Sequence, residues 1–246
     1  FQSLKNPFYL TFLFYFALIS ASSQNIFPYE KEMIDDDKYY FQEINFRNTS
    51  ENIELSGTLI TPKGVFDKIV VIVPGSGRDT RHAHFILAEE FLKKGIAVYR
   101  FDERGIGKSQ GQFNSGASSL TEDLGFAMAE LRTLESIKDK NIGILGHSLG
   151  GIASIGAFEA NRNIDFLVQI AAPVQKHGAF FKYQTLNNLS EFYQIKGKTQ
   201  AEVLELINSI YPIIIDNNNF KTIRNKAKKI AKSHNFKKGY YKFITP

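Results

Sequence analysis

The sequence of 246 residues contains no cysteine. This absence excludes disulfide bonds, cysteine-bound metals, a cysteine nucleophile and a lipid-modified cysteine near the N-terminus. A long apolar run is missing as well, because the N-terminal apolar stretch covers only residues 8–19 and is too short to cross a membrane comfortably. With 43% hydrophobic and 22% charged residues, the chain still has enough apolar side chains to form a sizeable core.

Acidic residues are missing from one region. Nine basic residues and no acidic residue lie between Lys221 and Lys242, while the rest of the chain has 21 basic against 25 acidic residues. The net charge of +5 therefore comes from this segment, whereas a nucleic-acid-binding protein would have basic residues spread over a face or a groove. We expect no nucleic-acid partner. We interpret the segment chiefly as the solvated face of a helix, and attraction of an anionic substrate or an acidic surface is the alternative.

The N-terminal segment has the pattern of a secretory signal. Lys5 precedes the apolar stretch, and the small residues Ser20-Ala21-Ser22-Ser23 follow it. We therefore expect residues 1–23 to be a signal peptide, membrane contact to be limited to that segment, and the protein to be secreted or periplasmic. A buried helix or a membrane anchor is the alternative. Residues 24–38 are polar and acidic and are expected to form a linker.

Residues 39–175 have the alternating pattern of an α/β protein. Residues 39–46 and 53–60 alternate apolar and polar side chains, which predicts an antiparallel pair of strands. Four apolar runs typical of strands buried on both faces then alternate with helices. The strands are residues 68–74, 96–101, 141–146 and 165–170, and the helices are residues 81–94, a helix with a capping box of Ser119 and Glu122, and residues 149–160. The pattern predicts a mostly parallel, doubly wound sheet with antiparallel edge strands and helices on both faces.

Residues 176–246 are polar and helical. Helices are predicted at 183–193, at 199–210 with a capping box of Thr199 and Glu202, and at 218–233. We interpret this part as a helical cap, followed by the approach to C-terminal strands that are missing from the sequence.

Gly146-His147-Ser148-Leu149-Gly150 joins a predicted strand to a predicted helix. In this setting G-x-S-x-G is the pattern of a nucleophile elbow, in which a sharp turn exposes the serine Oγ. Gly146 and Gly150 leave room for the turn. The backbone N–H of Leu149, at the start of the helix, is suited to bind developing negative charge. We predict Ser148 as the nucleophile and Leu149 as the first oxyanion donor, and an ordinary glycine-rich turn is the alternative.

Two further loops belong to the predicted site. Pro74-Gly75-Ser76-Gly77 follows the first buried strand, where an oxyanion hole needs its second N–H, and Ser76 is our candidate donor. A simple strand-to-helix turn is the alternative. The loop after the second buried strand contains Asp102 and Arg104, which we expect to form a buried ion pair that supports the loops around the site. The same loop contains Gly107-Lys108-Ser109, which matches the last three residues of a nucleotide-binding P-loop. The glycine that a P-loop requires five residues before Gly107 is Asp102 here, so we expect no nucleotide site.

In this order and spacing, these three segments resemble the α/β-hydrolase superfamily, most closely its serine esterases and the serine-aminopeptidase-like branch, over residues 39–175. The resemblance implies the α/β-hydrolase fold, an acyl-enzyme on Ser148 and a triad in the chain order serine, acid, histidine, without a metal or an organic cofactor. One strand and the cap follow Ser148, so the acid and the histidine are expected beyond residue 246. Asp123 is interpreted as a charge at a helix end. The histidines present are interpreted as surface or pocket-lining residues: His82, His84, His147, His177 and His234.

The sequence thus predicts a serine hydrolase that cleaves a small-molecule carboxylic ester. Without its base, the nucleophile loses several orders of magnitude in rate, so we expect low turnover from this chain. A serine peptidase or a thioesterase on the same fold is one alternative, because the elbow alone does not distinguish these substrates. A non-catalytic remnant of the fold that binds a ligand or a partner is the other.

Overall fold

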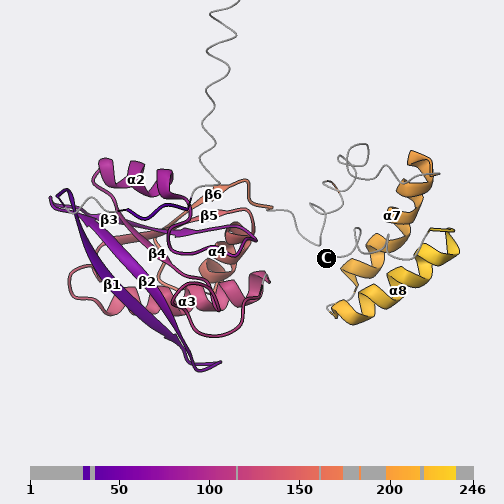
Figure 1. Cartoon of the computed structure of the whole chain (residues 1–246), viewed down its shortest axis with the longest axis horizontal. Helices are drawn as coiled ribbons and strands as arrows, with labels where there is room; N and C mark the ends of the chain where they lie inside the picture. The colour runs from indigo at the N-terminus through magenta and orange to yellow at the C-terminus, as the bar shows by residue number, and fades with distance from the viewer. Residues whose placement is uncertain are drawn as a thin grey trace, which may run out of the picture. The chain divides into compact units, whose positions relative to one another are not determined.

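A computed structural model describes residues 30–33, 37–114, 116–160, 162–173, 183, 198–216 and 219–236 (Figure 1). The predicted signal peptide, most of the predicted helix at 183–193 and the predicted C-terminal approach lie outside the described residues. The chain divides into an α/β unit, residues 1–172, and a helical unit, residues 173–246. Among the helices that the structure describes, none combines the length and the apolar character that a membrane span requires.

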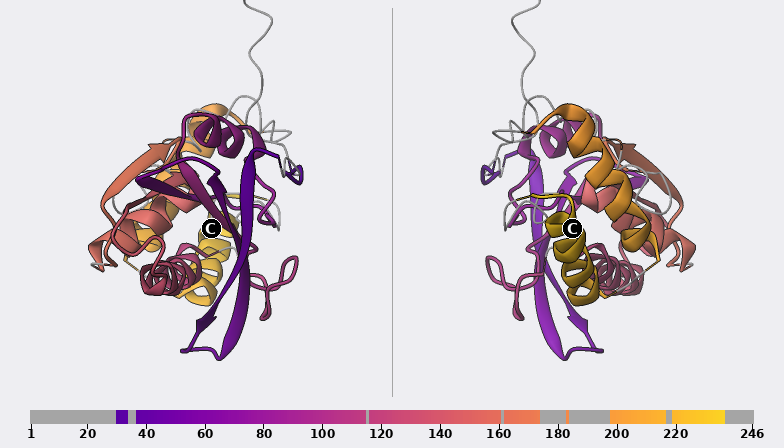
Figure 2. Two further views of the ribbon diagram at one scale, coloured as in Figure 1. Left: turned by 90° about the vertical axis from the view of Figure 1, so that its left-hand side faces the viewer. Right: turned by 90° about the vertical axis from the view of Figure 1, so that its right-hand side faces the viewer.

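The α/β unit is built on a sheet of six strands. Their bounds are β1 Tyr39–Asn48, β2 Ile53–Pro62, β3 Lys68–Val73, β4 Ala97–Phe101, β5 Asn141–His147 and β6 Phe166–Ile170. They lie in the order β1-β2-β4-β3-β5-β6. β2 pairs antiparallel with both β1 and β4, and the other pairs are parallel. Figure 2 shows β1 and β2 as a long twisted hairpin. The predicted mostly parallel sheet with an antiparallel edge is confirmed.

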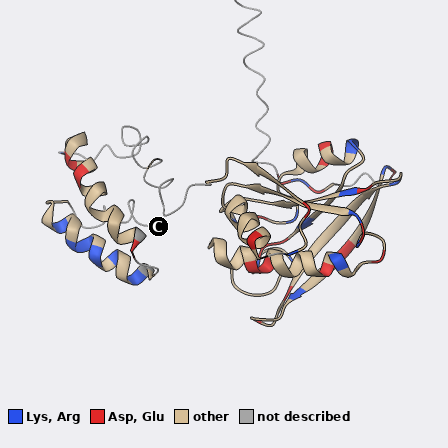
Figure 3. Cartoon of the chain, turned by 180° about the vertical axis from the view of Figure 1, so that it is seen from behind, with Lys and Arg blue, Asp and Glu red and all other residues tan. Residues whose placement is uncertain are grey.

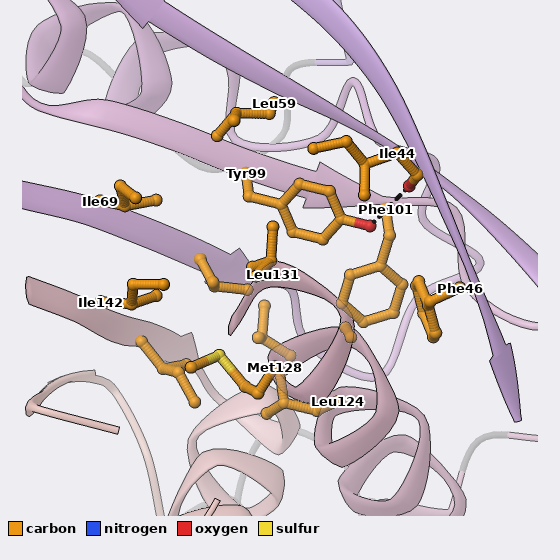
Figure 4. Close-up of a cluster of buried hydrophobic side chains, with 14 of the residues drawn as sticks. Ile44, Phe46, Leu59, Ile69, Tyr99, Phe101, Leu124, Met128, Leu131 and Ile142 are labelled. Carbon is orange, nitrogen blue, oxygen red and sulfur yellow. Dashed lines mark hydrogen bonds between the residues drawn. The ribbon is translucent and has the colours of Figure 1, made fainter. Parts of the chain in front are cut away.

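Helices cover both faces of this sheet (Figure 1). On one face, α2 (Phe85–Lys93) packs its buried Ala88 and Leu92 against apolar side chains of the strands. On the other face, α3 (Ala117–Thr133) and α4 (Leu149–Glu159) cover a larger apolar cluster, part of which is drawn in Figure 4. Two-sided burial explains why β3, β4 and β5 read as continuous apolar runs in the sequence. The predicted doubly wound arrangement is confirmed.

Two predicted helix starts are wrong. α2 begins at Phe85 rather than Arg81, because Arg81 is held by hydrogen bonds to Asp102 and His84 has a left-handed backbone (φ 56°). The capping box of Ser119 and Glu122 does not exist, since the N-cap of α3 is Gly116, three residues before Ser119. The Ser119 hydroxyl instead accepts a hydrogen bond from Asn114 Nδ2 at 3.0 Å.

The helical unit contains α7 (Gln200–Ile215) and α8 (Phe220–Ser233). The predicted capping box of Thr199 and Glu202 at the start of α7 is confirmed. α8 buries Ile223, Ala227 and Ala231, while its basic side chains are exposed and cover one side of the helix (Figure 3). This supports the interpretation of the basic segment as a solvated helix face. The role of the unit as a cap stays a prediction.

Gly57 in β2 makes a close contact that yields a stability prediction. A Cβ at this position would lie 2.2 Å from the hydroxyl of Tyr99, which donates a hydrogen bond to the Ile44 carbonyl at 2.9 Å (Figure 4). We expect Gly57→Ala to displace the buried Tyr99 ring and to lower the free energy of unfolding by about 1–3 kcal/mol. Urea unfolding measures this change, and an unchanged midpoint would contradict the close contact.

Candidate active site

Ser148 occupies a sharp turn between β5 and α4. Its backbone has φ 53° and ψ −116°, a conformation that residues with a side chain rarely adopt. The Ser148 N–H donates to the Ile170 carbonyl of β6 at 3.0 Å, so the turn is anchored to the sheet up to the serine itself. Strained backbone of this kind is found where the surrounding structure enforces it, often at functional sites. The strand–turn–helix geometry predicted for the elbow is confirmed.

The two glycines of the elbow are required by close backbone contacts. A Cβ on Gly146 would lie 2.6 Å from the Gly150 carbonyl oxygen, and a Cβ on Gly150 would lie 2.2 Å from the Pro74 carbonyl oxygen. Real Cβ contacts are not this short, and backbone atoms cannot rotate away as a side chain can. The same packing brings the start of α4 against the end of β3 and the loop that follows it.

That loop lies beside the serine. A Cβ on Gly75 would be 3.4 Å from Ser148 Cβ. Gly75, Ser76 and Gly77 line a small hollow together with Leu149, so the two predicted oxyanion residues are brought together. Glu103, Arg104, Asn114, Leu120 and Asp123 complete its lining. The free volume of the hollow is about 10 Å³, which is room for a single oxygen-sized group.

Asp102 and Arg104 are both buried and ion-paired, but the predicted pair between them is wrong. Asp102 Oδ2 accepts from Arg81 Nη2 at 2.9 Å, and its Oδ1 accepts from the Arg81 backbone N–H at 2.7 Å. Arg104 donates instead to the two carboxylate oxygens of Asp123, at 2.7 and 2.8 Å. Each therefore connects the loop after β4 to a different segment: Asp102 to the start of the α2 region, and Arg104 to α3.

The interpretation of Asp123 as a charge at a helix end is also wrong. Its carboxylate is 1% exposed and also accepts from Asn48 Nδ2 at 2.8 Å, so it is a core partner of Arg104 rather than a charge at a helix end. Hydrogen bonds to Asp123 raise the pKa of Arg104 despite burial. Burial raises the pKa of Asp102, but hydrogen bonds from Arg81 and Lys108 outweigh it, and the pKa is lowered.

Glu103, between these two residues, is a site residue that the sequence analysis missed. Its side chain is 6% exposed and lines the hollow beside Ser76 and Leu149. Within the described part of the chain, Glu103 Oε1 is buried with no hydrogen-bond partner. Burial, then the nearby carboxylates of Asp79 and Asp123, raise the pKa of Glu103 to about 8. No sequence pattern indicated this burial, because the apolar run of β4 ends at Phe101 and Glu103 lies in the charged loop that follows.

Two histidines lie near the elbow, and neither is suited to be a strong base. The His84 and His147 rings are 5.0 Å apart between centroids. Burial, then His147 and Arg100, lower the pKa of His84 to about 4, and burial lowers the pKa of His147. His82 lines a different pocket, of about 460 Å³, with Arg81 and Arg100. Two other histidines are also predicted to be surface or pocket-lining residues. His177 lies outside the described residues, and His234 lies in the helical unit.

Residues 65–231, more than half of the chain, match the model of a protein family described as serine aminopeptidase, S33. The resemblance to the α/β hydrolases that the motifs indicated is confirmed by this match. None of the curated proteins compared shows a significant match.

Solved structures show the same fold at low sequence identity. An esterase from Pyrococcus furiosus, Pf2001, is 22% identical with a TM-score of 0.54, over 81% of this chain and 71% of that chain. The α/β hydrolase GrgF from a Penicillium species is 18% identical with a TM-score of 0.50, over 78% and 77%. A hypothetical protein from Pseudomonas aeruginosa is 18% identical with a TM-score of 0.50, over 76% of this chain. The chain spans 56% of the length of that last structure and of one other. The fold is that of the α/β hydrolases.

Proposed function

Because the chain belongs to the serine aminopeptidase S33 family of α/β hydrolases, we propose that it cleaves carboxylic esters of small molecules through an acyl-enzyme on Ser148. One observation carries the proposal. Ser148 sits at the strained turn after β5, with the glycine-rich loop after β3 packed against it. This arrangement presents a serine hydroxyl next to backbone N–H groups at the start of a helix, which is what acyl transfer requires.

In the proposed reaction, Ser148 Oγ attacks the ester carbonyl and forms a tetrahedral intermediate. The backbone N–H groups of Leu149 and Ser76 bind its oxyanion. The C–O bond to the alcohol then breaks, the leaving oxygen takes up the proton that the Ser148 hydroxyl lost on attack, and the free alcohol leaves an acyl-serine behind. Water attacks the acyl-serine and releases the acid and free Ser148. The acid and the base of the triad would follow Ser148 in the chain, and we assign neither to a described residue.

A serine peptidase is the second candidate, because the matching family is described as an aminopeptidase. The nucleophile and the oxyanion site would be the same, and only the leaving group would differ: an amine in place of an alcohol. Comparing p-nitrophenyl esters with amino-acyl p-nitroanilides of matched acyl groups separates the two activities.

The nucleophile is tested with a fluorophosphonate probe, which reacts covalently with activated serines. We expect slow but specific labelling of wild-type protein at Ser148, because no described residue is assigned as its acid or base. Ser148→Ala should lose the label completely, since no other serine lies at such a turn in the described part of the chain. Ser136→Ala removes an exposed serine in the segment after α3 and should keep full labelling. Peptide mapping by mass spectrometry identifies the modified residue. Labelling of Ser148→Ala at the wild-type rate would rule out the proposed nucleophile.

A further inference from the structure

Glu103 is unusual among the charged residues of the α/β unit. Its neighbours Asp102 and Arg104 are each paired with an opposite charge, whereas Glu103 Oε1 is buried without a hydrogen-bond partner among the described residues. An ionised carboxylate in such a place loses its hydration without compensation. A buried polar atom of this kind calls for an explanation, and a ligand that it binds is one.

The charges around Glu103 favour its neutral form. Asp79 faces it from the loop after β3, and Asp123 faces it from α3. The cationic residue that lines the hollow is Arg104, and its guanidinium is already bonded to Asp123 and to Glu51. Burial and the two carboxylates therefore leave Glu103 mostly protonated at pH 7, with a pKa of about 8. A protonated carboxyl group is a hydrogen-bond donor.

The position of Glu103 connects this donor to the proposed reaction. It lines the same hollow as Ser76, Gly77 and Leu149, and this hollow adjoins Ser148 through Gly75. The volume of about 10 Å³ is enough for one oxygen-sized group. The group of an ester that fits there is its carbonyl oxygen, which becomes the oxyanion when Ser148 attacks.

We propose that Glu103 is a catalytic residue of the oxyanion site, where its neutral carboxyl O–H donates a hydrogen bond to the substrate carbonyl oxygen as negative charge develops on it. The proposal rests on the proposed function of Ser148. Glu103 forms no covalent bond and keeps its proton throughout. Carboxylic acids that burial keeps neutral can serve as oxyanion donors in this way. Once ionised, the same group would repel the oxyanion, so the contribution of Glu103 reverses as the pH rises through its pKa.

The test uses two variants, Glu103→Gln and Glu103→Leu, in the full chain. Gln has nearly the same shape and an N–H donor that does not titrate, whereas Leu fills the space without a donor. We measure the rate of fluorophosphonate labelling of Ser148 between pH 6 and pH 10, because the phosphonyl oxygen takes the place of the carbonyl oxygen. At pH 7 we expect Glu103→Gln to remain within a few-fold of wild type and Glu103→Leu to be slower by about 10²-fold.

The pH profile distinguishes donation from mere filling of space. The ratio of the wild-type rate to the Glu103→Gln rate should fall about tenfold or more as the pH rises through about 8. A pH-independent ratio, or Glu103→Leu labelled as fast as wild type, would overturn the proposal. Absence of labelling in every protein, wild type included, would instead count against the nucleophile itself.

Unfolding measurements test the neutral state of Glu103 without relying on activity. Its pKa is higher in the folded protein than in the unfolded chain, so the folded state binds the proton more tightly. Stability is therefore lost as the pH rises from about 4.5 to about 8, by up to tenfold in the folding equilibrium constant per pH unit. We expect this loss in wild type relative to Glu103→Gln, and parallel pH dependences in the two proteins would contradict a neutral Glu103.

Discussion

Replacing Asp123 by Ala should lower the free energy of unfolding of the α/β unit by about 3–5 kcal/mol. The side chains of Arg104 and Asp123 are only 6% and 1% exposed. Without Asp123, the Arg104 guanidinium keeps its charge inside the protein and retains only the half-exposed carboxylate of Glu51. The expected loss in the free energy of unfolding is large because a buried cation loses its main partner, whereas loss of an exposed ion pair changes the free energy of unfolding only slightly.

Urea unfolding followed by circular dichroism measures this loss. Glu90→Ala is the matched control, because it breaks an ion pair with Lys93 in which both side chains are at least half-exposed, and such pairs contribute at most about 1 kcal/mol. Replacing both partners with Arg104→Met and Asp123→Leu should cost much less than Asp123→Ala alone, since neither partner of this pair is then left as an unpaired buried charge. Equal effects of Asp123→Ala and Glu90→Ala would show that Arg104 does not depend on its buried partner.

Gly150→Ala should disable the nucleophile while leaving Ser148 in the sequence. The added Cβ would lie 2.2 Å from the Pro74 carbonyl oxygen and 2.4 Å from that of Val73, so α4 must move away from the end of β3. This movement separates Ser148 from the loop that carries Ser76. A misplacement of about 1 Å costs on the order of 10²-fold in rate, and overpacking of this kind costs about 1–3 kcal/mol or more in stability.

The rate of fluorophosphonate labelling and the urea midpoint are measured together for this variant. Gly64→Ala is the control, because no atom lies within 4 Å of a Cβ added there. It should match wild type in both measurements. Normal labelling of Gly150→Ala would mean that α4 and the loop after β3 can separate without cost to the site.

The elbow and the sheet could be predicted because their determinants are local. The apolar runs at β3, β4 and β5 are continuous in the chain, and Gly146 and Gly150 stand two residues on either side of Ser148. Such a tight turn allows few residue types at those positions, so the sequence pattern is enough to predict the geometry of the turn.

Ion pairs could not be assigned in the same way. Asp102 and Arg104 are near one another in sequence, but the fold pairs them with Arg81 and Asp123, which lie on other segments. The burial of Glu103 is likewise a property of packing, because the hollow that it lines is formed by the loop after β3, by α3 and by the start of α4. The apolar run of β4 ends with the strand and contains no information about either arrangement.

The strand order also has a consequence for how the site comes into being during synthesis. The hairpin of β1 and β2 joins neighbouring segments and can form as soon as residue 62 has left the ribosome, since its contacts are local. β3 pairs with β5, whose register places Lys68 opposite Asn141, so the chain between them must be made first. Until then the nascent protein contains Gly75 and Glu103 but no Ser148 beside them. The proposed site therefore requires β5 to join β3 and, because the Ser148 N–H donates to the Ile170 carbonyl, β6 to join β5. Only then is Ser148 held beside the two loops that were synthesised before it.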